Sequence, residues 1–398
     1  MNALKTISIL ADDLTGASDA CAPLALSFGT GRVCLSLGDA SAAAGRGLVS
    51  FDGDLRKSTE ATARETITAF SDMLRQSGRL DGLVWLKIDS ATRGHIARDV
   101  GLLLQAMPRF RGAVVAPAYP ANGRLFLEGK AVFVDGSRDM PSLRGAFEDA
   151  GFSVALLSDI SGGDGDIGAR IDAAFESGAR IVLADTTDQA DLETLAPALV
   201  ERHATVLGVS SAGLIEAIAG SAGTETILPD RPLTCLFGTQ SRISRLQLDT
   251  LQRRGDAIRV SRTAAAWNAL SDASHSAAIT AAVETESARI FDILPQYDAV
   301  QTPEASKGLA RVMAPLLDEL GIVLLSGGDT ARAFLEARGI EKFDVTGVFE
   351  HGMPICRADG LPYAFILKSG GFGDSETLLR LADFIKTSET QTCQTIPQ

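Results

Sequence analysis

Two adjacent acids, Asp12 and Asp13, directly follow the apolar run Thr6–Leu10 and precede a helical pattern. Carboxylates at the end of a strand can accept hydrogen bonds from hydroxyl groups, take a hydroxyl proton or hold a hydrated Mg²⁺ ion. Thr15 could cap the helix. The alternative is that Asp13 only caps this helix and Asp12 is solvated, since acids are common at helix starts.

A second polar group follows the predicted strand Leu83–Ile88, which contains Lys87. Asp89, Ser90 and Arg93 come next. These cations, this carboxylate and these hydroxyls suit a polyhydroxylated acid, and Arg93 can bind a carboxylate through two parallel hydrogen bonds. A surface Lys–Asp pair is the alternative. Arg56 follows the acidic segment 52–54 and is a weaker candidate for binding such an acid.

Glycine turns follow three predicted strands in the second half of the chain. They read GTQS at 238–241, SGGDTA at 326–331 and KSGGFGD at 368–374, and each precedes a helical pattern. Paired glycines let backbone N–H groups approach a phosphate, and the N-terminus of a helix adds partial positive charge. One such turn could serve any tight bend, but three together predict a nucleotide site. The sequence contains no GxxxxGK[ST] motif, which excludes a P-loop enzyme.

Two further segments allow more than one interpretation. Residues 163–168 form a GxGxxG with Asp185 at a later strand end, which would fit a dinucleotide site. Asp164 and Asp166 would repel a pyrophosphate there, so a flexible turn is the favoured explanation. The proline-rich segment 117–124 could fix a side chain over a pocket or form only a rigid turn.

Short apolar runs alternate with longer helical patterns along the whole chain, which predicts two α/β domains with mostly parallel sheets. The Gly- and Pro-containing segment 220–232 divides them into residues 1–225 and 226–398. The predicted strands are Thr6–Leu10, Leu48–Phe51, Leu83–Ile88, Ala113–Ala116, Ser153–Leu157, Ile181–Ala184, Thr205–Val209, Leu233–Phe237, Ala257–Val260, Arg289–Ile293, Ile322–Leu325, Val345–Phe349 and Tyr363–Leu367. The predicted helices include Ser58–Gln76, Ile96–Met107, Ile167–Glu176, Arg242–Arg254, Pro303–Leu320 and Ser375–Lys386.

Composition excludes several classes of protein. The 398 residues carry a formal net charge of −13, which argues against nucleic acid as a partner. No apolar run approaches the ~20 residues that cross a bilayer, so no membrane partner is expected. The N-terminus does not resemble a signal peptide, and five scattered cysteines favour reduced thiols and a cytoplasmic location. The four isolated histidines predict no resident metal.

Five segments together resemble the four-carbon acid sugar kinase family. They are ADDLTGA at 11–17, KIDSATRG at 87–94, PAYPANGR at 117–124, SGGDTA at 326–331 and KSGGFGD at 368–374, in the order of the family and across nearly the whole chain. The resemblance implies a sugar-acid-binding domain, a nucleotide-binding domain and an active site in the cleft between them. It further implies Mg-ATP-dependent phosphorylation of threonate, erythronate or a 3-oxo-tetronate, and a homodimer.

The resemblance also implies roles for individual residues. Asp12, Arg56, Lys87, Asp89, Ser90 and Arg93 would bind the sugar acid, and Ser241, Gly327, Gly328, Asp329, Thr330, Gly370 and Gly371 would bind ATP. Asp12, Asp89 and Arg93 are the catalytic candidates, with Asp12 or Asp89 as the proton acceptor. The FDGDLR segment at 51–56, the GTQS turn at 238–241, and Ala91 and Thr92 depart from the usual pattern and leave the acid open. An NAD-dependent sugar-acid dehydrogenase and a non-catalytic sugar-acid-binding protein are the alternatives.

Overall fold

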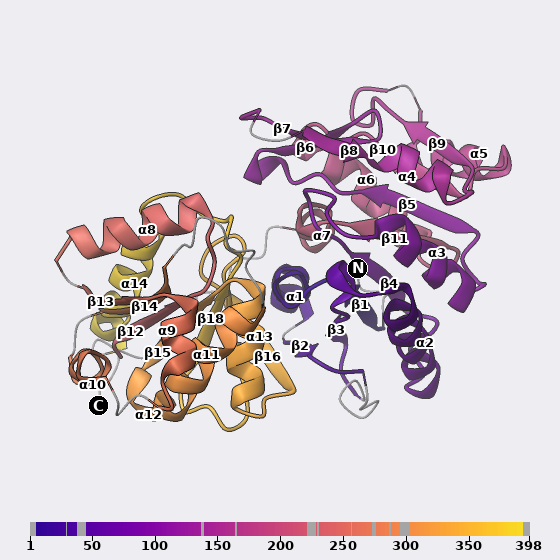
Figure 1. Ribbon diagram of the computed structural model, residues 1–398. Helices are drawn as coiled ribbons and strands as arrows, with labels where there is room; N and C mark the ends of the chain where they lie inside the picture. The colour runs from indigo at the N-terminus through magenta and orange to yellow at the C-terminus, as the bar shows by residue number, and fades with distance from the viewer. Residues whose placement is uncertain are drawn as a thin grey trace, which may run out of the picture. The chain divides into compact units, whose positions relative to one another are not determined.

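The computed structural model describes residues 5–28, 30–37, 45–136, 139–163, 165–220, 228, 231–255, 257–272, 276–285, 288–294 and 303–392. The chain divides into two compact units, Met1–Gly223 and Thr224–Gln398. Each unit contains mostly parallel strands flanked by helices (Figure 1).

The first unit contains a parallel sheet in the order β2-β3-β1-β4-β11-β5-β10-β9. A separate antiparallel sheet is formed by β6, β7 and β8. The strands are β1 Ile7–Ala11, β2 Gly31–Cys34, β3 Leu48–Asp52, β4 Leu83–Lys87, β5 Gly112–Ala116, β6 Arg124–Leu127, β7 Lys130–Phe133, β8 Asp139–Ser142, β9 Val154–Leu157, β10 Ile181–Ala184 and β11 Val206–Ser210.

Helices cover the parallel sheet of the first unit in two layers. In one layer α2 packs on α3 and α3 on α4; in the other α1 packs on α7, α7 on α6 and α6 on α5. The helices are α1 Leu14–Phe28, α2 Glu60–Gln76, α3 Ile96–Ala106, α4 Leu143–Asp149, α5 Ile167–Glu176, α6 Gln189–Glu201 and α7 Ala212–Ala219, with 3₁₀ turns η2 Leu55–Lys57 and η3 Pro120–Asn122. A core that includes Phe51, Phe70 and Val100 lies under α2 and α3.

The second unit has parallel strands in the order β13-β14-β12-β15-β18, continued by antiparallel β17 and β16. Helices α8 and α14 pack together, as do α9, α11 and α13. The strands are β12 Leu233–Phe237, β13 Ala257–Arg262, β14 Ala288–Ile293, β15 Ile322–Ser326, β16 Lys342–Val348, β17 Pro354–Arg357 and β18 Phe365–Lys368. The helices are α8 Arg242–Arg253, α9 Ala264–Ala269, α10 Ala277–Val283, α11 Pro303–Met313, η5 Ala314–Leu316, α12 Leu317–Leu320, α13 Gly328–Ala337 and α14 Thr377–Thr392.

The predicted α/β class with mostly parallel sheets is confirmed, but some elements differ. The predicted helix Pro303–Leu320 breaks after Met313 into η5 and α12. Pro315 lies in this break, and proline removes a helical N–H donor. The short strands β2, β6, β7, β8 and β17 were not predicted, because each has only four residues, one of them charged, and so lacks the apolar run seen in β9 and β10.

Candidate active site

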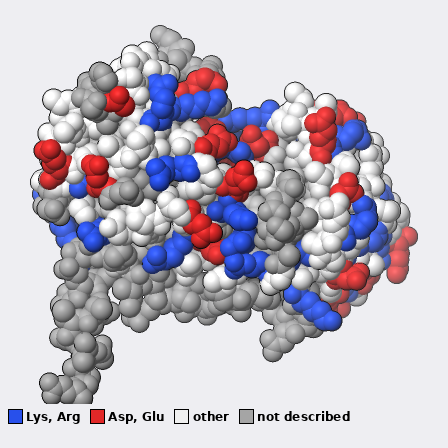
Figure 2. Space-filling model, turned by 90° about the horizontal axis from the view of Figure 1, so that it is seen from below, with Lys and Arg blue, Asp and Glu red and all other residues white. Residues whose placement is uncertain are grey.

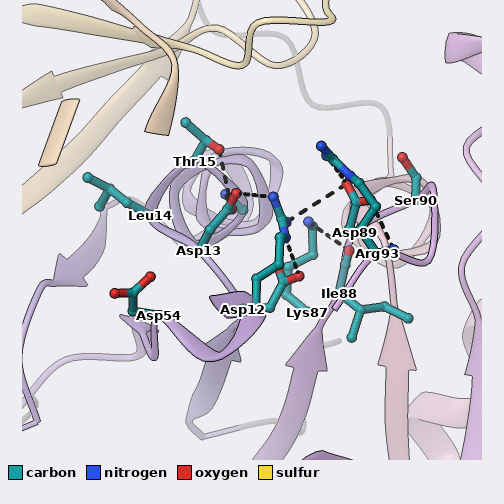
Figure 3. A network of polar contacts seen from close by, with 12 residues as sticks. Asp12, Asp13, Leu14, Thr15, Asp54, Lys87, Ile88, Asp89, Ser90 and Arg93 are labelled. Carbon is teal, nitrogen blue, oxygen red and sulfur yellow. Dashed lines mark hydrogen bonds and ion pairs between the residues drawn. The ribbon is translucent and has the colours of Figure 1, made fainter. Parts of the chain in front are cut away.

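A partly buried network of charged side chains lies where three neighbouring strands of the first unit end (Figure 3). Ala11 is the register partner of both Asp52 and Lys87, so β1, β3 and β4 end together. Asp12 follows β1 directly, Arg56 follows β3 in the turn η2, and Asp89 follows β4. The carboxyl ends of parallel strands are where ligands bind in α/β sheets.

Arg56 occupies the centre of this network. Its Nε lies 2.9 Å from Oδ2 of Asp12, and its Nη2 lies 3.0 Å from Oδ1 of the same carboxylate. Its Nη1 lies 2.5 Å from Oδ2 of Asp13, and its Nη2 lies 3.8 Å from Oδ1 of Asp89. Arg56, a weaker candidate from the sequence alone, therefore links all three carboxylates.

Asp89 and Arg93 form a second two-pronged ion pair. Arg93 Nε donates to Oδ2 of Asp89 at 2.7 Å and Nη2 donates to Oδ1 at 2.8 Å. Thr92 has a φ of 54°, which turns the chain back so that Arg93 faces Asp89. The guanidinium expected to bind a carboxylate thus binds one from its own chain, while half of its side chain remains exposed.

Lys87 and Ser90 complete the predicted sugar-acid residues. Lys87 is buried, and its Nζ donates to the carbonyl oxygen of Ile88 at 3.0 Å. Ser90 is also buried, and its hydroxyl accepts from Nη1 of Arg124 at 2.5 Å. The proline-rich segment 117–124, which contains η3, therefore holds Arg124 against this group of residues.

The two candidate proton acceptors have opposite electrostatics. Burial raises the pKa of Asp12, and the nearby charge of Asp13 adds to this, while the cations Arg56 and Lys87 only partly oppose it. Burial alone would also raise the pKa of Asp89, but the hydrogen bond of Arg93 and the neighbouring positive charges lower it below its ordinary value. Asp12 is therefore the more basic carboxylate.

The alternatives weighed for these residues are wrong in part. Asp13, not Thr15, caps α1: Oδ1 of Asp13 accepts from the backbone N–H of Gly16 at 2.6 Å and from the Thr15 hydroxyl at 3.3 Å. Asp12 is not solvated, because only 4% of its surface is exposed. Lys87 and Asp89 are both buried and so do not form a surface pair.

Sequence reasoning missed Arg98 and Asp99. Arg98 holds the turn that carries Arg56, and Asp99 binds Arg98. Nη1 of Arg98 donates to the carbonyl of Ser58 at 2.7 Å, and Nη2 donates to the carbonyl of Leu55 at 3.0 Å. Nε of Arg98 donates to Oδ1 of Asp99 at 2.8 Å. A signal existed, because these two residues are the only charges in the otherwise apolar helix IARDVGLLLQA.

The glycine turns of the second unit come together in the same way. Phe237, Ser326 and Lys368 end β12, β15 and β18 in matching register. A Cβ atom on Gly238 would lie 2.2 Å from the Thr330 hydroxyl, and one on Gly370 would lie 2.3 Å from the Thr239 hydroxyl. Glycine is therefore required where the turns touch each other.

Two helices begin at these turns. Helix α13 starts at Gly328 after Gly327, whose φ of 100° favours glycine, and α8 starts after Ser241. Gly327 has no side chain to cap α13, and the side chain of Ser241 makes no capping hydrogen bond to α8. The Ser326 hydroxyl is buried beside them with no hydrogen-bond partner among the described residues. Backbone N–H groups at helix starts, together with a spare hydroxyl, suit a phosphate group.

The other predicted nucleotide residues have different environments. Thr330 is buried, and its hydroxyl lies 3.2 Å from that of Ser306. Asp329 lies in the first turn of α13, and Gly371 is exposed. Sequence reasoning missed Gln247, whose Nε2 donates to the carbonyls of Phe372 and Asp374 and so fixes the third turn.

The glycine pattern at 163–168 forms a capped turn, with Asp164 outside the described residues. Oδ1 of Asp166 accepts from the backbone N–H of Gly168 at 3.0 Å and caps α5. A Cβ atom on Gly168 would lie 2.4 Å from the Arg202 guanidinium. A carboxylate therefore lies at the helix start where a pyrophosphate would bind, and helix packing explains this glycine.

Three further findings concern the surface charge, the potential metal ligands and the apolar helices of the described residues. On the face shown in Figure 2, Lys and Arg side chains are interspersed with Asp and Glu among the residues described. Among these same parts of the chain, no group of three or more His, Cys, Asp or Glu side chains is suited to hold a metal. No helix within the described ranges is both long and apolar enough to span a membrane.

Family models match both units. The model of a sugar-binding N-terminal domain matches residues 7–144 and 146–218, and that of a nucleotide-binding C-terminal domain matches residues 234–378. The two family models thus define an α/β protein with a sugar-binding N-terminal domain and a nucleotide-binding C-terminal domain. The chain belongs to the four-carbon acid sugar kinase family, as its sequence motifs predicted.

Named relatives span nearly the full length of the chain. It is 28% identical to a D-threonate kinase from Cupriavidus necator, over 93% of this chain and 95% of that protein. It is 24% identical to a 3-oxo-tetronate kinase from Methylobacterium radiotolerans, over 95% and 99%. It is also 24% identical to a D-erythronate kinase from Heliobacterium modesticaldum, over 96% and 98%.

Solved structures share the fold. A Salmonella typhimurium protein described as a tRNA synthase matches with a TM-score of 0.78 at 21% identity, over 95% of this chain and 99% of that one. A Haemophilus influenzae protein matches with a TM-score of 0.69 at 20% identity, over 96% and 99%.

Proposed function

We propose that this chain transfers the terminal phosphoryl group of ATP to a hydroxyl group of a four-carbon sugar acid. The full-length similarity to kinases of D-threonate, 3-oxo-tetronate and D-erythronate carries this proposal. The network around Arg56 supports it, because the network offers carboxylates to hydroxyl groups and cations to a carboxylate at one edge of a sheet.

Asp12 is the proposed proton acceptor. Its burial keeps its pKa above the ordinary value, which makes it a better base than Asp89. The substrate hydroxyl oxygen bonds to the terminal phosphorus, the bond from that phosphorus to the bridging oxygen breaks, and ADP leaves with the bond's electron pair. The hydroxyl proton passes to Asp12, which Arg56 holds through two hydrogen bonds.

The remaining residues of the first unit would bind and orient the acid. Arg93 is half-exposed and already binds a carboxylate. The substrate carboxylate would therefore either bind this guanidinium together with Asp89 or take the place of Asp89. Lys87, Ser90 and Arg56 would complete the sugar-acid site. Exchange of one carboxylate for another keeps the charge on Arg93 paired throughout.

The three glycine turns of the second unit would hold the phosphates of ATP. Backbone N–H groups at the starts of α8 and α13 supply donors without requiring many cationic side chains. Mg²⁺ would enter as Mg-ATP, bound mainly by phosphate oxygens and water. Ser241, Gly327, Gly328, Asp329, Thr330, Gly370 and Gly371 keep their proposed role in this site.

The decisive experiment measures ADP release from Mg-ATP with a panel of threonates, erythronates and 3-oxo-tetronates. Turnover with one acid, and none without it, would establish the kinase and identify its acid. No turnover with any acid, in a protein that ATP stabilises against heat, would reject this substrate class. The capped turn at 163–168 does not favour an NAD-dependent dehydrogenase, and the named kinases do not favour a non-catalytic binding protein.

Two properties stay predictions. A homodimer is expected, and light scattering during size-exclusion chromatography would give the mass in solution. A cytoplasmic location is likewise expected, and fractionation of cells of the source organism would test it.

A further inference from the structure

A lysine is buried beneath the proposed phosphate site of the second unit. Lys368 ends β18, and none of its surface is exposed. Its Nζ lies 3.2 Å from the carbonyl oxygen of Ser369 and 3.4 Å from the hydroxyl of Ser244. In the sequence, Lys368 is the first residue of the KSGGFGD motif.

The surroundings of Lys368 connect it to two of the glycine turns. Its backbone carbonyl accepts from the N–H of Gly327 at 2.9 Å. The hydroxyl of Ser244, which lies beside its ammonium group, donates to the carbonyl of Gly370 at 2.7 Å. Lys368 is also the register partner of Ser326, the residue with the unpartnered buried hydroxyl. The ammonium group therefore lies directly behind the turns.

This placement brings two positive centres together. Ser244 is in the first turn of α8, so the ammonium group of Lys368 lies beside the positive end of that helix dipole. A buried ammonium group is costly, and the positive end of a helix adds to that cost. An anion at the turns would be attracted by both centres at once, and it would offset this cost.

We infer that Lys368 supplies, from behind the glycine turns, the positive charge that binds the phosphates of the nucleotide. This inference rests on the proposed function. Because the charge acts through a poorly screened interior, its effect grows with the number of negative charges on the ligand. A lysine that only fixed the turns through Ser244 would affect all nucleotides equally.

Isothermal titration of ATP, ADP, AMP and adenosine separates these two roles. The wild type is compared with Lys368→Met and with Lys368→Gln, which keeps a donor for Ser244 but removes the charge. We expect the Kd for ATP to rise roughly 30-fold in both variants, or about 2 kcal/mol at 1.4 kcal/mol per tenfold change. The rise should shrink through ADP to AMP and vanish for adenosine.

A matched control is Lys307→Met, which makes the same chemical change on an exposed residue of α11 in the same unit. Its ion pair with Glu304 is exposed on both sides, so its loss should leave all four Kd values unchanged. Equal losses for all four ligands in the Lys368 variants, or wild-type affinity in Lys368→Gln, would overturn the inference. Absence of ATP binding by the wild type would instead overturn the proposed function.

A second measurement needs no variant and covers the case in which both substitutions prevent folding. Inorganic tripolyphosphate carries the charges without the base or sugar. We expect it to displace ATP from the wild type and to retain its affinity within about tenfold between about 0.1 and 0.5 M KCl, since buried charges are weakly screened. A failure of tripolyphosphate to compete with ATP would overturn the inference.

Discussion

The two units place polar groups at the same edge of their sheets but build them from different material. In the first unit the groups are charged side chains, and Arg56 joins three carboxylates. In the second unit they are mainly glycine backbone, hydroxyl groups and helix starts, with the buried Lys368 behind them. One site is a network of ion pairs, and the other is a backbone cradle.

This difference has a chemical reason. A small hydroxylated acid differs from its relatives only in where each oxygen points, so its recognition requires side chains with fixed donors and acceptors. A polyphosphate offers many equivalent oxygens, and backbone N–H groups at helix starts bind them well. We therefore expect changes in the first unit to affect the acid and turnover, and changes in the second to affect ATP.

The largest expected effect comes from Asp12→Asn. The substitution keeps the shape of the side chain but removes the base, so kcat should fall at least ~10²-fold. The Kd for ATP should stay within about twofold, because the variant leaves the backbone cradle intact. Discontinuous assays of ADP formation measure kcat, and titration with ATP measures the Kd. Asp13→Asn is the matched control and should cost less, because an amide oxygen can still cap α1.

The pH profile of the wild type adds to this test. The pKa of Asp12 is raised, and a protonated carboxyl group cannot accept a proton. The value of kcat/KM should therefore fall with decreasing pH, at a pH above the ordinary range of aspartate. Near-normal kcat in a folded Asp12→Asn variant, or an equal loss of ATP affinity, would break the division between the two sites.

For the network around Arg56, the sequence predicted which residues take part better than it predicted which of them form ion pairs with each other. Asp12, Asp89, Ser90 and Arg93 follow predicted strands and Lys87 lies near the end of one, so topology alone brings them to one edge. That Arg93 pairs with Asp89 depends on the positive φ of Thr92, which has no sequence signature. The central place of Arg56 depends on the turn η2, which is only three residues long.

A medium effect is expected from Gly370→Ala in the second unit. The new Cβ would lie 2.3 Å from the hydroxyl of Thr239 and 3.1 Å from its Cβ, so the turn must shift. We expect the KM for ATP to rise about tenfold, or about 1.4 kcal/mol, with the KM for the acid unchanged. Steady-state kinetics with each substrate varied in turn would show this.

The double variant Gly370→Ala with Thr239→Ala provides the control. It removes the hydroxyl that the new methyl group would meet, so part of the ATP affinity should return. If the KM for the acid rises as much as that for ATP, the backbone cradle does not act on the nucleotide alone. If neither value changes, this turn lies outside the nucleotide site.

The long helices and buried parallel strands were more predictable than the short hairpin and the isolated polar residues that accompany them. Long helices and buried parallel strands have strong periodicity, and most were predicted within one or two residues. The hairpin of β6 and β7, which carries Arg124 toward Ser90, was not predicted, because each of its four-residue strands begins with a charged residue and offers only a short apolar run. The half-buried Arg98 and the buried Gln247 act through backbone carbonyls, and their partners are fixed only once the chain has folded.

The smallest expected effect is on stability and comes from Asp99→Asn. This substitution tests how much the burial of charged side chains lowers the free energy of unfolding of the first unit. Only 3% of the surface of Asp99 is exposed, and burial raises its pKa to about 6, against an opposing effect of Arg98. The folded protein therefore binds this proton more tightly than the unfolded chain does. Its contribution to stability is present below the unfolded pKa of Asp, about 4, and is lost as the pH rises through about 6.

Asparagine mimics the protonated form at every pH and still accepts a hydrogen bond from Arg98. A pKa raised from about 4 to about 6 sets an upper limit of roughly 3 kcal/mol on the variant's gain in the free energy of unfolding over the wild type at pH 8. Burial of the amide N–H donors should lower the gain to about 1 kcal/mol, with nothing gained at about pH 4. Urea titrations at both pH values measure the difference. A variant less stable than the wild type at pH 8 would mean that the Arg98–Asp99 ion pair stabilises the Arg56 turn by more than burial of the carboxylate costs. The charged side chains of the first unit would then form net favourable ion pairs, and the first unit would differ from the backbone cradle of the second in the groups it uses and not in stability.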